Sequence, residues 1–350
     1  MIDIVRKNKL IFFCMSLILL LISIIMAVGL GPVNIEFGTV WNVIFYKIMP
    51  ESLKPNRIWK ISTEKIIWNI RTPRVILGCI VGGGLALTGV SMQSFTKNPL
   101  SEPYILGVSS GASTGAVAVA LTGALKHFGI FAMPMGAFFG SLASLVLVYN
   151  LAKTRRGIMP VRLILTGIAV SAMFTSITNF IVFNAKNETG IRTAMFWMMG
   201  SLAGAKWDYV FIPLFVLGIS FLVLFFLSRA MNTMLLGEQT AITLGININV
   251  VRRIIIVVSS LTAGVIVAVS GSIGFVGLII PHIVRNIMGS NHRWVIPMSL
   301  ISGAIFVVWA DVAARLLVAP QELPIGIVTS MTGAPFFVWL LKKNNYSFGG

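Results

Sequence analysis

Side chains that commonly carry catalysis or bind metals are few in this chain and lie far apart in the sequence. Cys14 and Cys79 both lie within apolar runs, so we expect neither a disulfide framework nor a CxxC metal site. His127, His282 and His292 form no HExxH or other paired pattern. The residue types and their spacing therefore predict no catalytic residues and no metal site built by this chain alone.

The segment with the clearest chemical purpose is the polar insertion between Arg229 and Arg253. Its pattern predicts a short amphipathic helix, a glycine turn and a second short helix, with Glu238 near the centre. Four apolar residues are expected on its water-facing surface: Leu235, Leu236, Ala241 and Leu244. An exposed apolar helix face is typical of docking into a partner's groove, and a helix lying on the membrane surface is the alternative.

The elements that must position this segment are membrane-spanning helices. Hydrophobic residues make up 57% of the chain and charged residues 11%, with a mean hydropathy of +0.93, whereas a soluble domain has about 25% charged residues. The uncharged run 10–30 has the length that crosses a bilayer as a helix. We predict an all-α polytopic membrane protein, a single domain over residues 1–350, with ten spans: 10–31, 73–93, 104–124, 130–152, 162–184, 208–228, 252–271, 273–289, 294–317 and 324–341.

The distribution of basic residues predicts the orientation of these helices. With both termini in the cytoplasm, 15 of the 27 Lys and Arg residues lie on the cytoplasmic side, in line with the positive-inside rule. Seven of the others lie in or just after the first outer segment: Lys47, Lys54, Arg57, Lys60, Lys65, Arg71 and Arg74. This excess predicts either a positive surface that docks an acidic partner or a solvated loop that escapes the rule.

Two segments interrupt the helical pattern, NPLSEP at 98–103 and GSIGFVGLIIPH at 271–282. Irregular backbone at membrane depth is tolerated only where protein buries it or where it lines a wet cavity. Interruptions at related positions indicate two inverted-topology halves, helices 2–5 and 7–10, as in many transporters. A further apolar piece at 193–204 is too short to cross the membrane and is expected to form a half-helix.

Several long blocks of the sequence resemble the iron-siderophore, haem and cobalamin ABC importer permeases, the FecCD-type family. They are RTPRVILGCIVGGGLALTGVSMQSFTKNPLSEPYILGVSSGAS at 71–113, FWMMGSLAG at 196–204, GEQTAITLG at 237–245, GSIGFVGLIIPHIVR at 271–285, ADVAARLL at 310–317 and ELPIGIVTSMTGAPFFVWLL at 322–341. The resemblance covers nearly the whole chain after the first helix.

The resemblance implies a type II ABC importer permease, a transport subunit and not an enzyme, in a bacterial cytoplasmic membrane. Its implied partners are a dimer of ATPase subunits, an extracytoplasmic substrate-binding protein and a second permease, either a copy or a related subunit, with no nucleic acid. Because the chain has no nucleotide-binding motif, ATP and Mg would bind the ATPase, and this chain would bind no cofactor.

The resemblance also assigns residues to three sites. A coupling segment, about 229–251, would seat in the ATPase through Gly237, Glu238, Ala241, Leu244 and Gly245. The outer surface would meet glutamates of the binding protein through Arg71, Arg74 and Arg315, and for Arg315 an i,i+4 pair with Asp311 is the competing interpretation. The gate would include Asn98, Pro99 and Leu100, together with Pro160 and Val161, where the chain departs from the family pattern.

The cargo is not readable from the residues. Iron(III)-siderophore complexes are the commonest cargo of the family, so they are the first hypothesis for the cargo. Haem and cobalamin are the alternatives. An ion-coupled secondary transporter is the remote alternative. It would need buried ion-binding carboxylates, whereas Glu102, Asp208 and Glu322 all lie near the ends of predicted spans.

Overall fold

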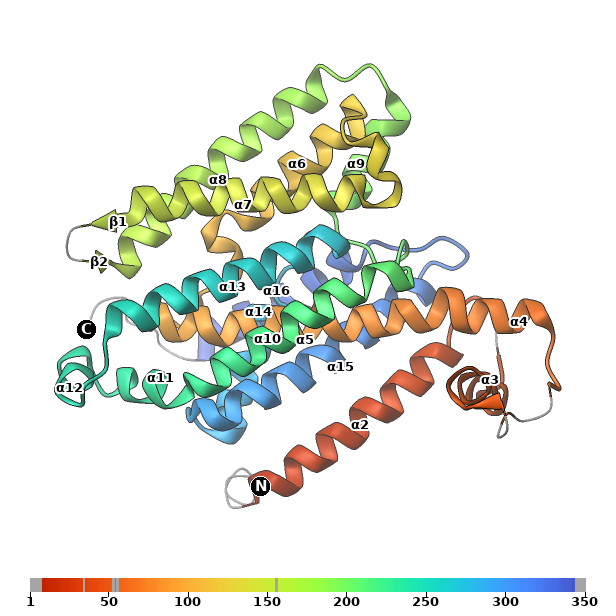
Figure 1. Ribbon diagram of the computed structural model, residues 1–350, viewed down its shortest axis with the longest axis horizontal. Coiled ribbons are helices and arrows are strands. Elements are labelled where there is room, and N and C mark those ends of the chain that lie inside the picture. Colours follow the sequence, from red (N-terminus) through yellow and green to blue (C-terminus); the bar gives the residue numbers. More distant parts are fainter. Residues whose placement is uncertain (1–7, 34, 52–53, 55–56, 155–156, 344–350) are drawn as a thin grey trace.

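The structure is a computed structural model that describes residues 8–33, 35–51, 54, 57–154 and 157–343. Most of this chain is helical, and the long helices run along one common direction (Figure 1). The helical elements are α2 (Lys9–Gly29), α3 (Phe37–Ile48), α4 (Ile61–Lys65), η2 (Ile66–Arg71), α5 (Thr72–Thr96), η3 (Pro103–Leu106), α6 (Val108–Thr122), η4 (Lys126–Phe131), α7 (Ala132–Ala152), α8 (Pro160–Phe183), α9 (Glu188–Met198), η5 (Trp207–Tyr209), α10 (Phe211–Phe226), α11 (Ser228–Leu235), α12 (Glu238–Thr243), α13 (Ile248–Ser270), α14 (Val276–Met288), α15 (His292–Leu316) and α16 (Ile325–Lys343). An antiparallel hairpin, β1 (Lys153–Thr154) and β2 (Gly157–Ile158), joins α7 to α8.

The all-α polytopic fold is confirmed. Among the described residues, seven helical segments are long and apolar enough to cross a membrane, and they contain α2, α5, α7, α8, α10, α13 and α15. The shorter apolar helices α6, α14 and α16 account for the other three predicted spans. We compare the most apolar stretch of each candidate span. In the span that contains α5, 89% of these residues are buried inside the protein, whereas in α2 only 17% are buried. Helix α5 therefore forms the centre of the fold, and α2 lies at its edge.

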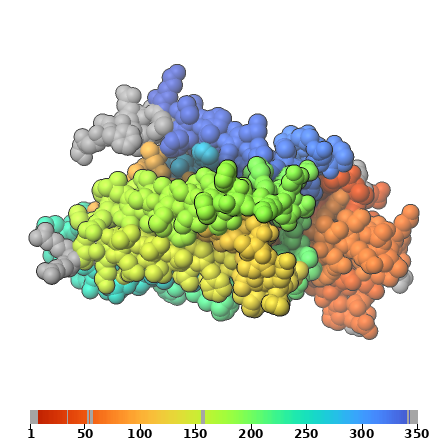
Figure 2. Space-filling view, turned by 90° about the horizontal axis from the view of Figure 1, so that it is seen from above, coloured from red at the N-terminus to blue at the C-terminus, as the bar shows by residue number. Residues whose placement is uncertain are grey.

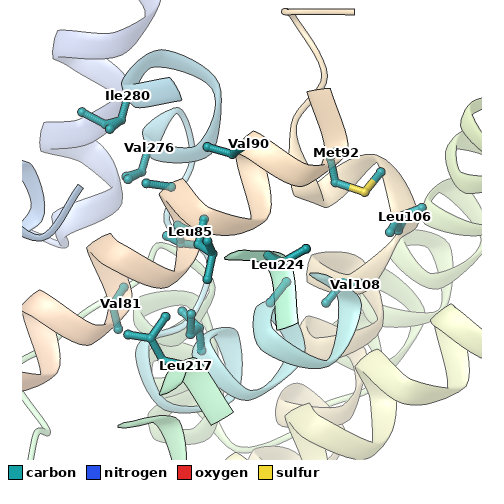
Figure 3. Close-up of a cluster of buried hydrophobic side chains, with 14 of the residues drawn as sticks. Val81, Leu85, Val90, Met92, Leu106, Val108, Leu217, Leu224, Val276 and Ile280 are labelled. Carbon is teal, nitrogen blue, oxygen red and sulfur yellow. The ribbon is translucent and has the colours of Figure 1, made fainter. Parts of the chain in front are cut away.

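Helices of the two predicted halves pack against one another. Helix α5 of the first half packs against α14 and α15 of the second, and α13 of the second half packs against α6 and α7 of the first (Figure 1). These contacts join the two predicted halves through one shared core. Figure 3 shows part of the shared core, where Val81 and Leu85 of α5 lie among Leu217 of α10 and Val276 of α14.

Glycines allow the central helices to approach closely. A Cβ atom added at Gly82 of α5 would lie 2.1 Å from the carbonyl oxygen of Gly303 in α15, and one added at Gly89 would lie 1.9 Å from that of Gly277 in α14. Both contacts are with backbone, which cannot move aside as a flexible side chain would. Small residues at such crossings are the usual means of helix association in membranes.

We expect Gly82→Ala to destabilise the protein by about 1–3 kcal/mol, the usual cost of overpacking. The matched control is Gly218→Ala in α10, because a Cβ at Gly218 meets nothing within 4 Å. Thermal unfolding in mild detergent measures both variants: Gly82→Ala should unfold several degrees below the wild type and Gly218→Ala should not. Equal midpoints would contradict this account of the α5–α15 contact.

Two helical elements differ from the sequence-based expectation. The outer segment contains α3, which buries Val40 and Val43 and packs against α2, and is not simply a solvated loop. The half-helix expected at 193–204 is α9, which begins five residues earlier because the Asn187 side chain accepts a hydrogen bond from the Gly190 N–H. It ends before Gly200, which has a left-handed φ of 76°.

Short helices and a hairpin lie at two ends of the molecule. The α12 end carries α11, α12 and the β1–β2 hairpin, and the α3 end carries α3 and α4 (Figure 1). In Figure 2, most of the visible red and orange atoms lie at the α3 end.

Candidate functional site

The segment between α10 and α13 forms two short helices separated by glycines. Helix α11 is followed by Gly237, with φ of 123°, and α12 is followed by Gly245, with φ of 80°. L-amino acids with side chains rarely adopt these angles, so glycine suits both corners. The predicted helix–turn–helix form of this segment is confirmed.

One face of this segment is apolar and exposed. Leu236 is 72% exposed, Ile242 64% and Leu244 66%. Ile242 was not among the residues expected on this face. Ala241 was expected there, but that expectation is wrong because Ala241 is fully buried and its carbonyl accepts a hydrogen bond from Ile246 N–H. Ala241 therefore attaches α12 to the body of the protein, and its neighbours form the exposed face.

Glu238, at the start of α12, links the segment to two other elements. Its Oε1 accepts a hydrogen bond from Nη2 of Arg252 in α13 and lies 3.8 Å from Nζ of Lys97. Lys97 is the left-handed residue, with φ of 54°, that ends α5. The Glu238 side chain is still 46% exposed. Glu238 therefore joins α12 to α13 and lies close to the end of α5.

The loop that follows α5 contains the first set of predicted gate residues. Asn98 Oδ1 accepts a hydrogen bond from Leu100 N–H at 2.9 Å, which holds the loop in a tight turn. Pro99 borders a cavity of about 220 Å³ together with Leu235 of α11, so the loop adjoins α11. Pro160 and Val161 form the first turn of α8, and Val161 is 67% exposed. Within the described ranges, no hydrogen bond or ion pair joins these two residues to the Asn98–Leu100 loop.

The two interrupted segments meet inside the protein. The Tyr104 hydroxyl donates to Ile273 O at 2.9 Å and accepts from Ile273 N–H at 3.1 Å. Glu102 Oε1 accepts from Phe275 N–H at 2.7 Å. The sequence predicts both interruptions but not this contact. Side chains of one half thus satisfy the irregular backbone of the other, as burial at membrane depth requires.

A cavity of about 490 Å³ lies beside this contact. Methionines and small residues from three elements line it: Met198, Met199, Ser272, Gly274, Gly326, Ile327, Ser330 and Met331. Met198 and Met199 belong to the predicted half-helix region, whereas the contribution of α16 is apparent only in the structure.

Arg71 and Arg315 lie at the α3 end, but the expectation that they are exposed there is wrong. Arg71 is 5% exposed, and its guanidinium donates to Val28 O, Gly29 O and Val33 O. Arg315 is 2% exposed and donates to Ala27 O and Leu30 O. The last carbonyls of a helix lack partners within the helix. The two arginines supply those partners to α2, which is why they are buried.

Arg74, also expected at the surface, is 6% exposed and forms ion pairs with two carboxylates. Its Nη2 lies 2.9 Å from Asp311 Oδ1, and its Nη1 lies 2.9 Å from Glu322 Oε2. The competing i,i+4 interpretation for Arg315 is confirmed, since Arg315 Nε lies 3.1 Å from Asp311 Oδ2. Together these residues join α5, α15 and the segment before α16.

Most of the basic residues expected to form a positive outer surface are paired. Lys47 and Arg57 form ion pairs with the buried Glu64. The Nζ atom of Lys54 lies 3.3 Å from Oε1 of Glu51. Arg71 and Arg74 are buried, as described above. Of the seven basic residues, that leaves Lys60 and Lys65, which are exposed and for which no ion pair is found among the described residues. The positive surface is therefore smaller than the sequence indicates.

The comparisons with known proteins point to one family. Residues 19–343 match the FecCD transport family. The chain belongs to this family. The cobalamin import system permease protein BtuC of Halobacterium salinarum is 41% identical over 282 residues, covering 80% of this chain and 74% of that protein. The Fe(3+)-citrate import system permease protein YfmD of Bacillus subtilis is 37% identical over 342 residues, covering 96% of each.

A solved structure agrees with membership of the FecCD family. It is described as an inward-facing conformation of a metal-chelate type ABC transporter, and it matches with a TM-score of 0.80 at 30% identity, covering 95% of this chain and 99% of that chain. The FecCD chain is thus the membrane-spanning permease of a type II ABC importer, a transport component. Among its described residues, no group of three or more His, Cys, Asp or Glu side chains is placed to hold a metal ion.

Proposed function

We propose that this FecCD permease moves an iron(III)-siderophore complex inward across the bacterial cytoplasmic membrane by alternating access, powered by separate ATPase subunits. The observation that carries the proposal is the exposed apolar face of Leu236, Ile242 and Leu244, tied by Glu238 to Arg252 and Lys97. A helix face of this kind suits a groove in a partner. Gly237, Glu238, Leu244 and Gly245 would form or shape the contact, and Ala241 would anchor it.

The same links supply a path from the ATPase to the gate. Closure of the two ATPase subunits would displace α12, and Glu238 would pass that displacement to α13 and to the loop that contains Asn98, Pro99 and Leu100. Pro160 and Val161 would form the second part of the gate, at the start of α8. Movement of packed helices between two arrangements is a common form of such switching.

The remaining partners follow from the same proposal. A second permease, either a copy or a related subunit, would complete the pathway, and a substrate-binding protein would dock at the α3 end. Both termini would then lie in the cytoplasm. The Glu322 side chain is 34% exposed and forms an ion pair with Arg74. Arg74 would therefore come closest to a docked binding protein through this ion pair. Direct contact by Arg71 or Arg315 would require release of the α2 carbonyls.

The cargo assignment rests on the kinds of relatives found. Permeases named for Fe(3+)-citrate and iron(3+)-hydroxamate import match over most of the chain. The 41% identity to a cobalamin permease favours cobalamin as the second candidate, and the relative named for hemin transport in Yersinia pestis, at 33%, makes haem the third.

We expect cells that depend on this permease to accumulate a ferric siderophore, and unlabelled cobalamin or haem in excess should not reduce that uptake. The measurement is initial uptake of labelled ferric hydroxamate and ferric citrate in a deletion strain, with and without the gene restored. Strong competition by cobalamin, together with uptake of labelled cobalamin, would replace the siderophore assignment by the cobalamin one.

A further inference from the structure

A polar pocket of about 220 Å³ lies at the α12 end between α7 and α13. It is formed by the last turn of α7, the β1–β2 hairpin and the first turns of α13, and it is lined by Tyr149, Lys153, Thr154, Ile158, Asn249, Arg252 and Arg253. The pocket lies where two candidate membrane spans end, which is the level of lipid headgroups.

The pocket is strongly cationic. Lys153, Arg252 and Arg253 line it, and none of the lining residues is a carboxylate. Arg252 is 8% exposed and is held between Glu238 and the ring of Phe95, with its guanidinium carbon 5.9 Å from the ring centroid. Its buried Nε has no hydrogen-bond partner within the described chain. A buried guanidinium with one unpaired N–H, beside two exposed basic side chains, suits an anion with several oxygen atoms.

The surroundings of the pocket favour a lipid as the source of that anion. Apolar side chains are exposed on α13 next to it, where Val250 is 47% and Val257 48% exposed. Such surfaces beside a basic pocket accommodate acyl chains while the phosphate is bound by the cations. Basic pockets between membrane helices are known to select anionic headgroups.

We propose that this pocket binds the phosphate headgroup of an anionic phospholipid. The lipid would contact Lys153 and Arg253 directly and would lie against Arg252, the residue that holds Glu238 of the coupling segment. The site does not depend on which cargo the permease carries, so it can be tested separately from the proposed function.

The test is native mass spectrometry of the full-length chain in mild detergent, titrated with phosphatidylglycerol or phosphatidylcholine. We expect the wild type to retain one phosphatidylglycerol in clear preference to phosphatidylcholine. The double variant Lys153→Gln with Arg253→Gln should lose about 25-fold in phosphatidylglycerol affinity, since each basic residue near a membrane contributes about fivefold. Both side chains are exposed, so the variant should fold.

The control is the double variant Lys126→Gln with Lys186→Gln. It also removes two positive charges, at exposed positions that do not line the pocket. This variant should bind phosphatidylglycerol within about twofold of the wild type, because it leaves the pocket intact. Equal lipid retention by wild type and pocket variant, or an equal loss in both double variants, would overturn the proposal. Displacement of the lipid by millimolar inorganic phosphate would also overturn it, by showing that the pocket takes a free anion.

Discussion

Replacing Leu236 and Leu244 together with Asp is expected to reduce ATP-dependent uptake below about 1% of the wild-type rate. The two side chains are 72% and 66% exposed, so the change does not disturb the core. Loss of a central apolar residue of an interface costs about 2 kcal/mol or more. Two such losses weaken ATPase binding about a thousandfold. Initial uptake rates in proteoliposomes and recovery of the ATPase with the tagged permease measure the effect.

The matched control is Asn247→Asp, which adds a negative charge to the same segment without removing an apolar contact. Asn247 caps α13 by accepting a hydrogen bond from Val250 N–H, and Asp serves equally well as a cap. Uptake by this variant should remain close to the wild-type rate. If the leucine variant retained both uptake and the ATPase, the α12 face would not be the coupling surface.

Replacing Arg74 with Ala is expected to destabilise the permease by about 1–3 kcal/mol, because Asp311 and Glu322 both lose charge-assisted hydrogen bonds from its guanidinium. The Arg74 side chain is 7% exposed and that of Asp311 is 3% exposed. Asp311 would keep Arg315, but Glu322 would lose the ion pair that Arg74 provides. Thermal unfolding in detergent should show a midpoint several degrees below the wild type.

The same variant separates a structural role from a docking role for Arg74. Lys60→Ala, at an exposed position of the same end, should leave the midpoint unchanged and serves as the control. Arg74→Lys should recover part of the stability, because it retains the charge but not the forked geometry. An Arg74→Ala protein with a wild-type midpoint and weakened binding-protein affinity would show that Arg74 acts only in docking.

The helical architecture could be predicted because each span is determined by local composition. The interruptions at 98–103 and 271–282 are also local features, marked by proline and glycine. The Tyr104–Ile273 contact joins residues 169 positions apart. No local pattern encodes such a contact, so only the structure shows that the two interruptions satisfy each other.

The candidate site was predicted less completely, for a similar reason. The sequence indicates that Arg71 and Arg315 lie near the ends of spans, but it does not indicate that α2 ends beside them with unpaired carbonyls. Ala241 and Ile242 are neighbours on a six-residue helix. Which of the two faces the protein depends on how that helix packs, so the exposed face could be predicted as apolar but not residue by residue.

The central claim is that this FecCD permease transports its cargo only when a partner ATPase supplies energy through α12. The most direct test is cargo uptake by proteoliposomes containing the permease, with or without the ATPase and enclosed ATP, and with or without an ion gradient. We expect uptake to require both ATPase and ATP and to persist when ionophores abolish the gradient. Uptake by the permease alone, driven by an ion gradient, would contradict it and identify a secondary transporter.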